Sequence, residues 1–232
     1  MQASNADEIL RVNARLQGLA ESFAFLGGAV LGLLIEDRGA CPIRTTKDVD
    51  AVVDVATRTE YAHLEESLRM LGFRHDTRED APICRWLLDE ITVDIVPTAQ
   101  VVFGWKSAWL REARQAAVDI EIKPGQRVPV VTPPFFLAAK IEAFKDRGEA
   151  DFRGSVDLED IVTVVDGRPG IVGEIAAAPP ALRSYLRTEF TAMLRDRRFV
   201  ESLPGHLPPD RASQERLPIL LRRFQSIAEL PA

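Results

Sequence analysis

Three aspartates occupy strand-like positions of this sequence, where a charge needs compensation. Asp48 and Asp50 alternate with valine and alanine in the segment 47–55, and Asp94 is the one charge in the segment 91–97. Side chains at positions i and i+2 of a strand point to the same face, so Asp48 and Asp50 project together. Two carboxylates this close repel each other, and burial disfavours the charged form of each. A bound cation would compensate them.

A hard divalent cation suits such carboxylates. Mg²⁺ prefers carboxylate oxygens and keeps coordination positions for water and phosphate. If the strand of Asp94 lies beside the strand of Asp48 and Asp50, three carboxylates converge. Three carboxylates can hold two metal ions a few ångströms apart, the arrangement used for in-line displacement at phosphorus. The sequence therefore predicts a site for two Mg²⁺ ions at these aspartates.

Two adjacent glycines, Gly27 and Gly28, lie where a strand-like segment (22–27) passes into a helix-like segment (28–39). Glycine lets backbone N–H groups approach a phosphate without a side chain in the way. The N-terminus of a helix also favours an anion. Together with the aspartates, these features predict that the glycine pair contacts phosphate.

This combination of Gly-Gly, Asp-x-Asp in a strand and a lone strand aspartate resembles the signature of the nucleotidyltransferase (DNA polymerase β-like) superfamily. More narrowly, "LGGAVLGLL" followed by "RTTKDVDAVV" resembles the AbiEii/AbiGii toxin-type branch. The branch pattern Arg-x-Thr-x-Asp-hydrophobic-Asp is matched from Arg44 through Thr46 to the aspartates. The resemblance covers roughly residues 20–165. It implies that Arg44 and Thr46 orient the aspartates or contact phosphate.

The same branch carries a lysine early in a helix and, later, two aspartates three residues apart. Lys140 matches the lysine, and Asp157 and Asp160 match the pair, although Val156 stands where the branch usually has lysine. The resemblance implies that Lys140 meets the phosphates of the nucleotide. It implies that Asp160 either pairs with Lys140 or contacts the nucleotide, and it places Asp157 in the nucleotide-binding set.

The pattern of elements predicts an α+β chain. We expect a nucleotidyltransferase fold, with a small mixed sheet flanked by helices, in residues 1–132. A helical domain that contributes to the nucleotide or substrate cleft is expected in 133–232. Strands are predicted within 22–27, 47–55, 83–98 and 119–134. Helices are predicted over 5–22, 28–39, 57–73, 104–118, 135–148, 155–167, 171–178, 180–205 and 213–230. Asn5 is the candidate cap of the first helix.

Composition limits the protein class. The net charge of −6 argues against a nucleic-acid coat protein but allows a local basic groove. The longest apolar run, about 13 residues with three glycines, is too short to span a bilayer. The N-terminal segment lacks a secretory pattern, and Cys41 and Cys84 match no zinc or redox spacing. We expect a cytoplasmic protein with free thiols and no membrane partner.

The predicted chemistry is Mg²⁺-dependent transfer of a nucleoside monophosphate from an NTP to an acceptor hydroxyl. Asp48 and Asp50 would bind the ion shared with the phosphates. Asp94 would bind the ion nearest the hydroxyl or accept its proton. The resemblance implies an acceptor that is an RNA end, such as a tRNA acceptor stem, or a protein hydroxyl, in a toxin–antitoxin setting where a cognate antitoxin is a candidate partner.

Two alternatives stay open. A small molecule could be the acceptor, as in aminoglycoside nucleotidyltransferases, and the acidic net charge suits a cationic drug better than RNA. Alternatively, the chain is a non-catalytic binding partner or antitoxin, although uncompensated buried carboxylates would destabilise a fold that had no use for them. The simplest interpretation of the basic clusters at 195–198 and 222–223 is that they are solvent-exposed faces of helices. A helical domain that lines a groove for RNA would contain the same clusters.

Overall fold

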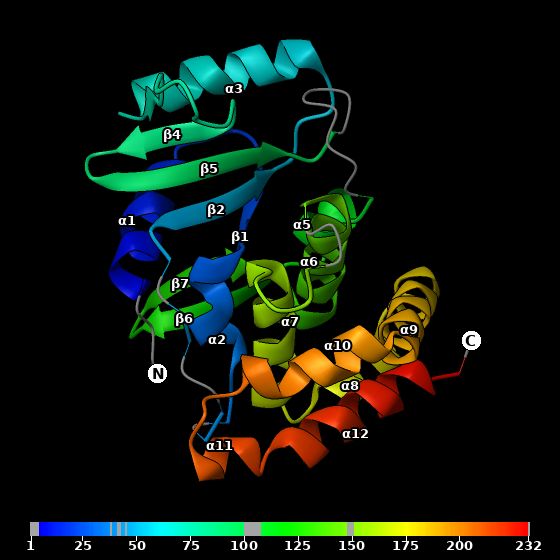
Figure 1. Cartoon of the computed structure of the whole chain (residues 1–232). Coiled ribbons are helices and arrows are strands. Elements are labelled where there is room, and N and C mark those ends of the chain that lie inside the picture. The colour runs from blue at the N-terminus through cyan, green and yellow to red at the C-terminus, as the bar shows by residue number, and fades with distance from the viewer. Residues whose placement is uncertain are drawn as a thin grey trace. The chain divides into compact units, whose positions relative to one another are not determined.

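The structure is a computed structural model that describes residues 5–37, 39–40, 43–44, 46–99, 108–147 and 151–231. The predictions that fall on Cys41 and on residues 104–107 lie outside these ranges. The chain forms two compact units, which Figure 1 shows as ribbons. Unit 1 comprises residues 1–33 and 44–132, and unit 2 comprises residues 34–43 and 133–232.

Unit 1 is built on one mixed sheet, in which the described residues form seven strands in the order β3-β4-β5-β2-β1-β7-β6 (Figure 1). The strands are β1 (Phe23–Leu26), β2 (Asp48–Val53), β3 (Arg74–His75), β4 (Arg85–Leu88), β5 (Ile91–Pro97), β6 (Val118–Lys123) and β7 (Gln126–Val130). Strand β2 pairs antiparallel with β1 and parallel with β5. The two strands that carry the predicted aspartates are therefore direct neighbours.

Alternation along β2 separates an apolar face of the sheet from a polar one. Val49 and Ala51 are buried, whereas Asp48 and Asp50 on the opposite face are half-buried. Helix α3 (Arg58–Met70) covers the apolar face, and its Arg69 lies over the ring of Trp86. A capping box of Thr57 and Glu60 starts α3. The polar face is left to carry the aspartates.

The first helices are shorter than predicted. Helix α1 (Ala6–Leu16) follows Asn5, but the Asn5 side chain donates to the backbone oxygen of Thr46 instead of capping the helix. A 3₁₀ turn (Gly28–Val30) and α2 (Leu31–Leu34) replace the helix predicted over 28–39. The helix stops there because the backbone N–H groups of Glu36 and Asp37 donate to the Gly167 carbonyl, inside unit 2.

Unit 2 is helical. It contains α6 (Pro133–Arg147), α7 (Val156–Gly167), α8 (Ile171–Ala177), α9 (Pro180–Arg195), α10 (Arg197–Ser202), a 3₁₀ turn (Leu203–His206), α11 (Arg211–Gln214) and α12 (Leu217–Ala228). The rings of Phe190 and Phe199 pack on Phe224 at centroid distances of 5.0 and 5.3 Å and form part of its core. Asp196 divides the helix predicted over 180–205, because its side chain accepts from the Arg198 N–H and caps α10. The predicted fold class, α+β with a mixed sheet and a helical C-terminal part, is confirmed.

Two smaller expectations concern the membrane and the thiols. Across the described ranges, no helix combines the length and the apolar character needed to cross a bilayer. Cys84 is a free, buried thiol. Burial raises the pKa of Cys84 to about 12, so the thiol stays protonated at neutral pH.

Candidate active site

The register of the sheet places the three predicted aspartates on one face. Asp50 of β2 lies opposite Asp94 of β5, and Asp48 lies opposite Thr92. Residues in register on neighbouring strands share a face, as do residues at i and i+2 of one strand. Asp94 is 8% exposed. Three carboxylates therefore project from one side of two adjacent central strands.

Arg85 compensates these charges. Strand β4 pairs antiparallel with β5, so Arg85 lies opposite Asp94. Its Nε and Nη2 donate to the two Asp94 carboxylate oxygens at 2.8 and 2.7 Å, and Nη2 lies 3.6 Å from Asp48 Oδ2. A bidentate pair of this kind is among the strongest hydrogen-bonded arrangements in proteins. It raises the pKa of Arg85, with the hydrogen bond to Asp94 as the main cause.

The carboxylates fit a divalent cation only in part. Oxygen donors are those that Mg²⁺ prefers, and Asp48 and Asp50 on one face suit one ion that takes its other ligands from water or phosphate. Among the residues that the structure describes, no group of three or more His, Cys, Asp or Glu side chains is arranged to hold a metal ion. Arg85 engages both oxygens of Asp94. The two-ion site at three aspartates stays a prediction.

Gly27 lies directly against Asp50. Its backbone has φ +76°, and a Cβ atom at this position would lie 1.9 Å from Asp50 Oδ2. Only glycine tolerates both the backbone angle and this contact. The helix-dipole part of the phosphate prediction is weakened, because the 3₁₀ turn and α2 that follow are too short to align many peptide dipoles.

Arg44 and Thr46 lie in the same cluster. Thr46 Oγ1 donates a hydrogen bond to Asp48 Oδ1 and thereby orients that carboxylate. The Arg44 guanidinium packs on Gly28, where a Cβ atom would lie 2.7 Å from Nη2. The structure thus brings together the Gly-Gly pair, Arg44, Thr46 and the aspartates within unit 1.

Lys140, Asp157 and Asp160 belong to unit 2, where they form one ion-pair network. Lys140 Nζ in α6 lies 3.1 Å from Asp157 Oδ1 and 2.6 Å from Asp160 Oδ2, both in α7. The two aspartates share a face of α7 because they are three residues apart. Asp160 is fully buried, and Asp157 also accepts from Arg147 at 2.9 Å. Lys140 is therefore held in place by two carboxylates.

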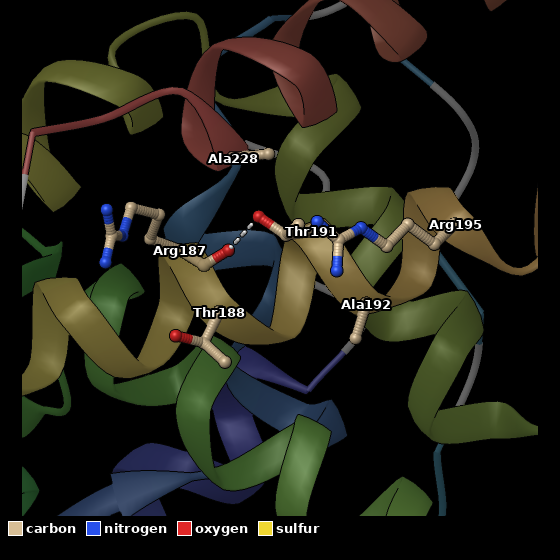
Figure 2. A pocket seen from close by; sticks show the side chains of 6 residues that line it. All are labelled: Arg187, Thr188, Thr191, Ala192, Arg195 and Ala228. Carbon is tan, nitrogen blue, oxygen red and sulfur yellow. Dashed lines mark hydrogen bonds between the residues drawn. The ribbon is translucent and has the colours of Figure 1, made fainter.

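A pocket of about 330 Å³ in unit 2 adds residues that the motifs do not single out (Figure 2). It is lined by Arg187, Thr188, Thr191, Ala192, Arg195 and Ala228. Arg187, Thr191 and Arg195 follow one another at four-residue spacing, which places them along one side of α9. Figure 2 shows the Arg195 side chain reaching back toward Thr191. Neither arginine forms an ion pair with any residue that the structure describes.

Comparison with known proteins supports the fold. No family model matches the sequence, and no curated protein matches it. Among solved structures, the chain is similar to an antigenic nucleotidyltransferase-like protein from Paracoccidioides brasiliensis, with 20% identity, coverage of 87% of this chain and 93% of that one, and a TM-score of 0.53. It is also similar to the antibiotic-resistance factor ANT(2″)-Ia, with 15% identity, coverage of 84% and 97%, and a TM-score of 0.50. The chain therefore has a nucleotidyltransferase-like fold.

Arg85 is the site residue that the motifs leave out. A signal for it exists in the sequence, because the tight turn at Asp89 and Glu90 fixes the register of the hairpin. In a hairpin with this turn, residues at equal distances from the turn on the two strands are paired. Leu88 is therefore expected opposite Ile91 and Arg85 opposite Asp94, as observed.

Proposed function

We propose that this chain is a nucleotidyltransferase that moves a nucleoside monophosphate from an NTP to an acceptor hydroxyl. The observation that carries the proposal is the contact between Gly27 and Asp50, at a bend beside the face that also presents Asp48. Such a bend lets a polyphosphate approach backbone N–H groups and a carboxylate pair together. The similarity in fold to proteins named as nucleotidyltransferases supports the same class of reaction.

In the proposed reaction, the acceptor oxygen forms a bond to the α-phosphorus while the bond to the α–β bridging oxygen breaks. Pyrophosphate leaves with that electron pair, and the hydroxyl proton is lost to solvent or a base. Asp48 and Asp50 would hold Mg²⁺, which when bound would neutralise charge on the phosphates. Thr46 keeps the Asp48 carboxylate oriented. Asp94 could act as the base only if Arg85 released it.

We keep Lys140, Asp157 and Asp160 in the nucleotide-binding part of the proposal. Lys140 carries a charge that suits the phosphates of an NTP. Its contacts with Asp157 and Asp160 fix the ammonium group before a ligand arrives. Fixing a long side chain in advance lowers the entropic cost of binding.

For the acceptor we propose RNA, in the toxin–antitoxin setting that the resemblance to AbiEii-like proteins implies. The pocket on α9 favours a polyanion, because Arg187 and Arg195 have no acidic partner among the described residues. Eight residues of helix separate them by about 12 Å, so both can contact one phosphodiester strand. A cationic drug would be repelled at the same place.

A small-molecule acceptor is the second candidate. The similarity in fold to an antibiotic-resistance factor favours it, as does the net charge of −6. This alternative does not need the two arginines of α9.

The test is transfer of label from NTPs carrying ³²P at the α-position, with Mg²⁺ and either total tRNA or a panel of aminoglycosides. We expect label in RNA. Label in a drug would instead support the second candidate. If neither acceptor is labelled with any NTP, the result favours the non-catalytic binding partner.

Charge reversal at the α9 pocket tests the RNA part separately. We expect Arg187→Glu and Arg195→Glu each to weaken binding of tRNA about tenfold at low salt, because each removes one phosphate contact and adds a repulsive charge. Filter binding at two salt concentrations measures the loss, and the salt dependence should become shallower. Arg211→Glu is the matched control, since Arg211 is exposed and pairs with Glu215 away from the pocket. An equal loss in the control would show only a bulk charge effect.

A further inference from the structure

The C-terminal end of α7 is closed by two arginines at α12. A helix leaves the carbonyl groups of its last turn without partners inside the helix. In α7, Arg223 of α12 donates to the carbonyls of Val165 and Asp166. Arg216, the residue before α12, also donates to the Asp166 carbonyl, at 3.1 Å. The next carbonyl, that of Gly167, accepts from a different part of the chain.

Residues 34–37 bind at this end of α7. The backbone N–H groups of Glu36 and Asp37 both donate to the Gly167 carbonyl at 3.0 Å. Arg216 Nη2 donates to Asp37 Oδ2 at 2.7 Å. The same arginine therefore caps the helix and holds the segment 34–37 against it.

The segment 34–37 approaches Gly167 too closely for a side chain at that position. A Cβ atom at Gly167 would lie 2.7 Å from Ile35 Cγ2 and 3.2 Å from Ala40 Cβ. Inserting a methyl group into a contact this tight forces the neighbours to shift. The helix itself would accept alanine, which is a better helix former than glycine. The requirement for glycine therefore comes from the docked segment.

The segment 34–37 begins where a helical run from the glycine bend, Gly27 and Gly28, comes to its end. The 3₁₀ turn from Gly28 passes directly into α2, whose last residue is Leu34. Arg168, which follows α7, donates from Nη1 to the Leu34 carbonyl at 2.7 Å. About two helical turns therefore connect the bend to this fixed end. A shift of the segment should displace the bend.

We propose that Gly167, Arg168 and Arg216 anchor the glycine bend by fixing the far end of the helical run. They are positioning residues, because they act through the run and not on a ligand. A bend that is held in place in advance lowers the entropic cost of receiving a polyphosphate. The role in nucleotide binding rests on the proposed function, whereas the anchoring of the bend does not.

The test compares Gly167→Ala with Gly173→Ala in the full-length protein, by hydrogen exchange of single amides followed by NMR. Both changes place alanine in a helix, but a Cβ atom at Gly173 in α8 would meet nothing within 4 Å. In Gly167→Ala we expect the amides of Glu36 and Asp37 to exchange about tenfold faster, because the segment is pushed away from their acceptor. The Leu31 amide, which is hydrogen-bonded at the bend, should exchange about threefold faster. Gly173→Ala should leave all three rates within about twofold.

Ile35→Ala tests whether the effect comes from the close contact. In the double variant Gly167→Ala/Ile35→Ala, the exchange of Glu36 and Asp37 should return to within about threefold of the unmodified protein. A general defect in α7 would not be repaired in this way. If Gly167→Ala does not fold, Asp37→Asn takes its place, because it breaks the pair with Arg216 on the side of the segment. It should speed exchange of the Glu36 amide about threefold, and an unchanged rate would count against the anchor.

Nucleotide binding is then measured on the same variants by calorimetry with a non-hydrolysable NTP. We expect Kd to rise about tenfold in Gly167→Ala and to recover in the double variant, while Gly173→Ala binds as the unmodified protein does. Unchanged exchange at Leu31 in a folded Gly167→Ala variant, or faster exchange there with an unchanged Kd, would overturn the proposal. If the unmodified protein binds no NTP while the exchange pattern holds, the proposed function is wrong and the anchor stands.

Discussion

Asp50→Asn is expected to lower the kcat of nucleotidyl transfer about 10³-fold, the order of effect seen when one electrostatic contact to a transition state is lost. Asparagine has nearly the same shape, so the contact with Gly27 can persist. It has no charge, so it cannot help Asp48 to hold a divalent cation against a polyphosphate. The measurement is single-turnover release of labelled pyrophosphate, with the Tm recorded to show that the fold is intact.

Asp54→Asn is the matched control for this prediction. Asp54 follows β2 directly, but its carboxylate accepts from Thr98 and lies 3.5 Å from Arg114. The same change from carboxylate to amide there should leave kcat within about twofold, because this carboxylate is engaged by Thr98 and Arg114 and is not one of the proposed cation ligands. If Asp50→Asn keeps more than a tenth of the activity, the carboxylate pair on β2 is not the cation site.

The strands were predictable because their signals are local. Alternation in 47–55 and 91–97 fixes which side chains face the core, and the tight turn at Asp89 fixes the hairpin. The order of the strands in the sheet depends on contacts between distant segments, so local patterns do not give it. One pairing could still be anticipated, because carboxylates on two apolar strands need a common compensating charge and the two strands should therefore be neighbours. The structure places these strands side by side, as that argument requires.

The helix predicted over 28–39 shows where local signals fail. Its residues have helical spacing, but the chain leaves the helix at Leu34 and is held inside unit 2. Arg216 pairs with Asp37 at 2.7 Å, and Arg168 donates to the Leu34 carbonyl. Contacts with residues more than 100 positions away in the sequence determine the conformation of this segment. The residue pattern within the segment does not predict these contacts.

The compensating charge at the aspartates was harder to predict than the aspartates themselves. A metal ion and an arginine satisfy the same electrostatic requirement, and composition does not distinguish them. Arg85 precedes Trp86 in a strand, and from the sequence alone the simplest interpretation is that its side chain is exposed to solvent. Only the pairing across the hairpin shows that its guanidinium reaches Asp94.

The second large effect is expected at Gly27. Gly27→Ala and Gly125→Ala both place a Cβ atom at a backbone angle near +75°, with φ +76° and +74° respectively. Gly125→Ala should lower the free energy of unfolding by about 1 kcal/mol, the usual cost for an L-residue at positive φ. Gly27→Ala should lower it further, because its ψ of −167° lies in a region that is essentially restricted to glycine. Urea denaturation measures both losses. The two variants differ in surroundings, because the new Cβ meets nothing within 4 Å at Gly125 and would lie 1.9 Å from Asp50 Oδ2 at Gly27.

That difference isolates the contact between the bend and the carboxylate. In Gly27→Ala, Asp50 must move by an ångström or more, and misplacement on this scale can cost about 10²-fold in kcat/KM. Gly125→Ala, which also places a side chain at positive φ but creates no close contact, should keep its activity. Equal activity in the two variants would mean that the reaction does not depend on how closely the backbone at Gly27 approaches Asp50. The proposed cradle for the polyphosphate would then be wrong, even if Asp50 itself proved essential.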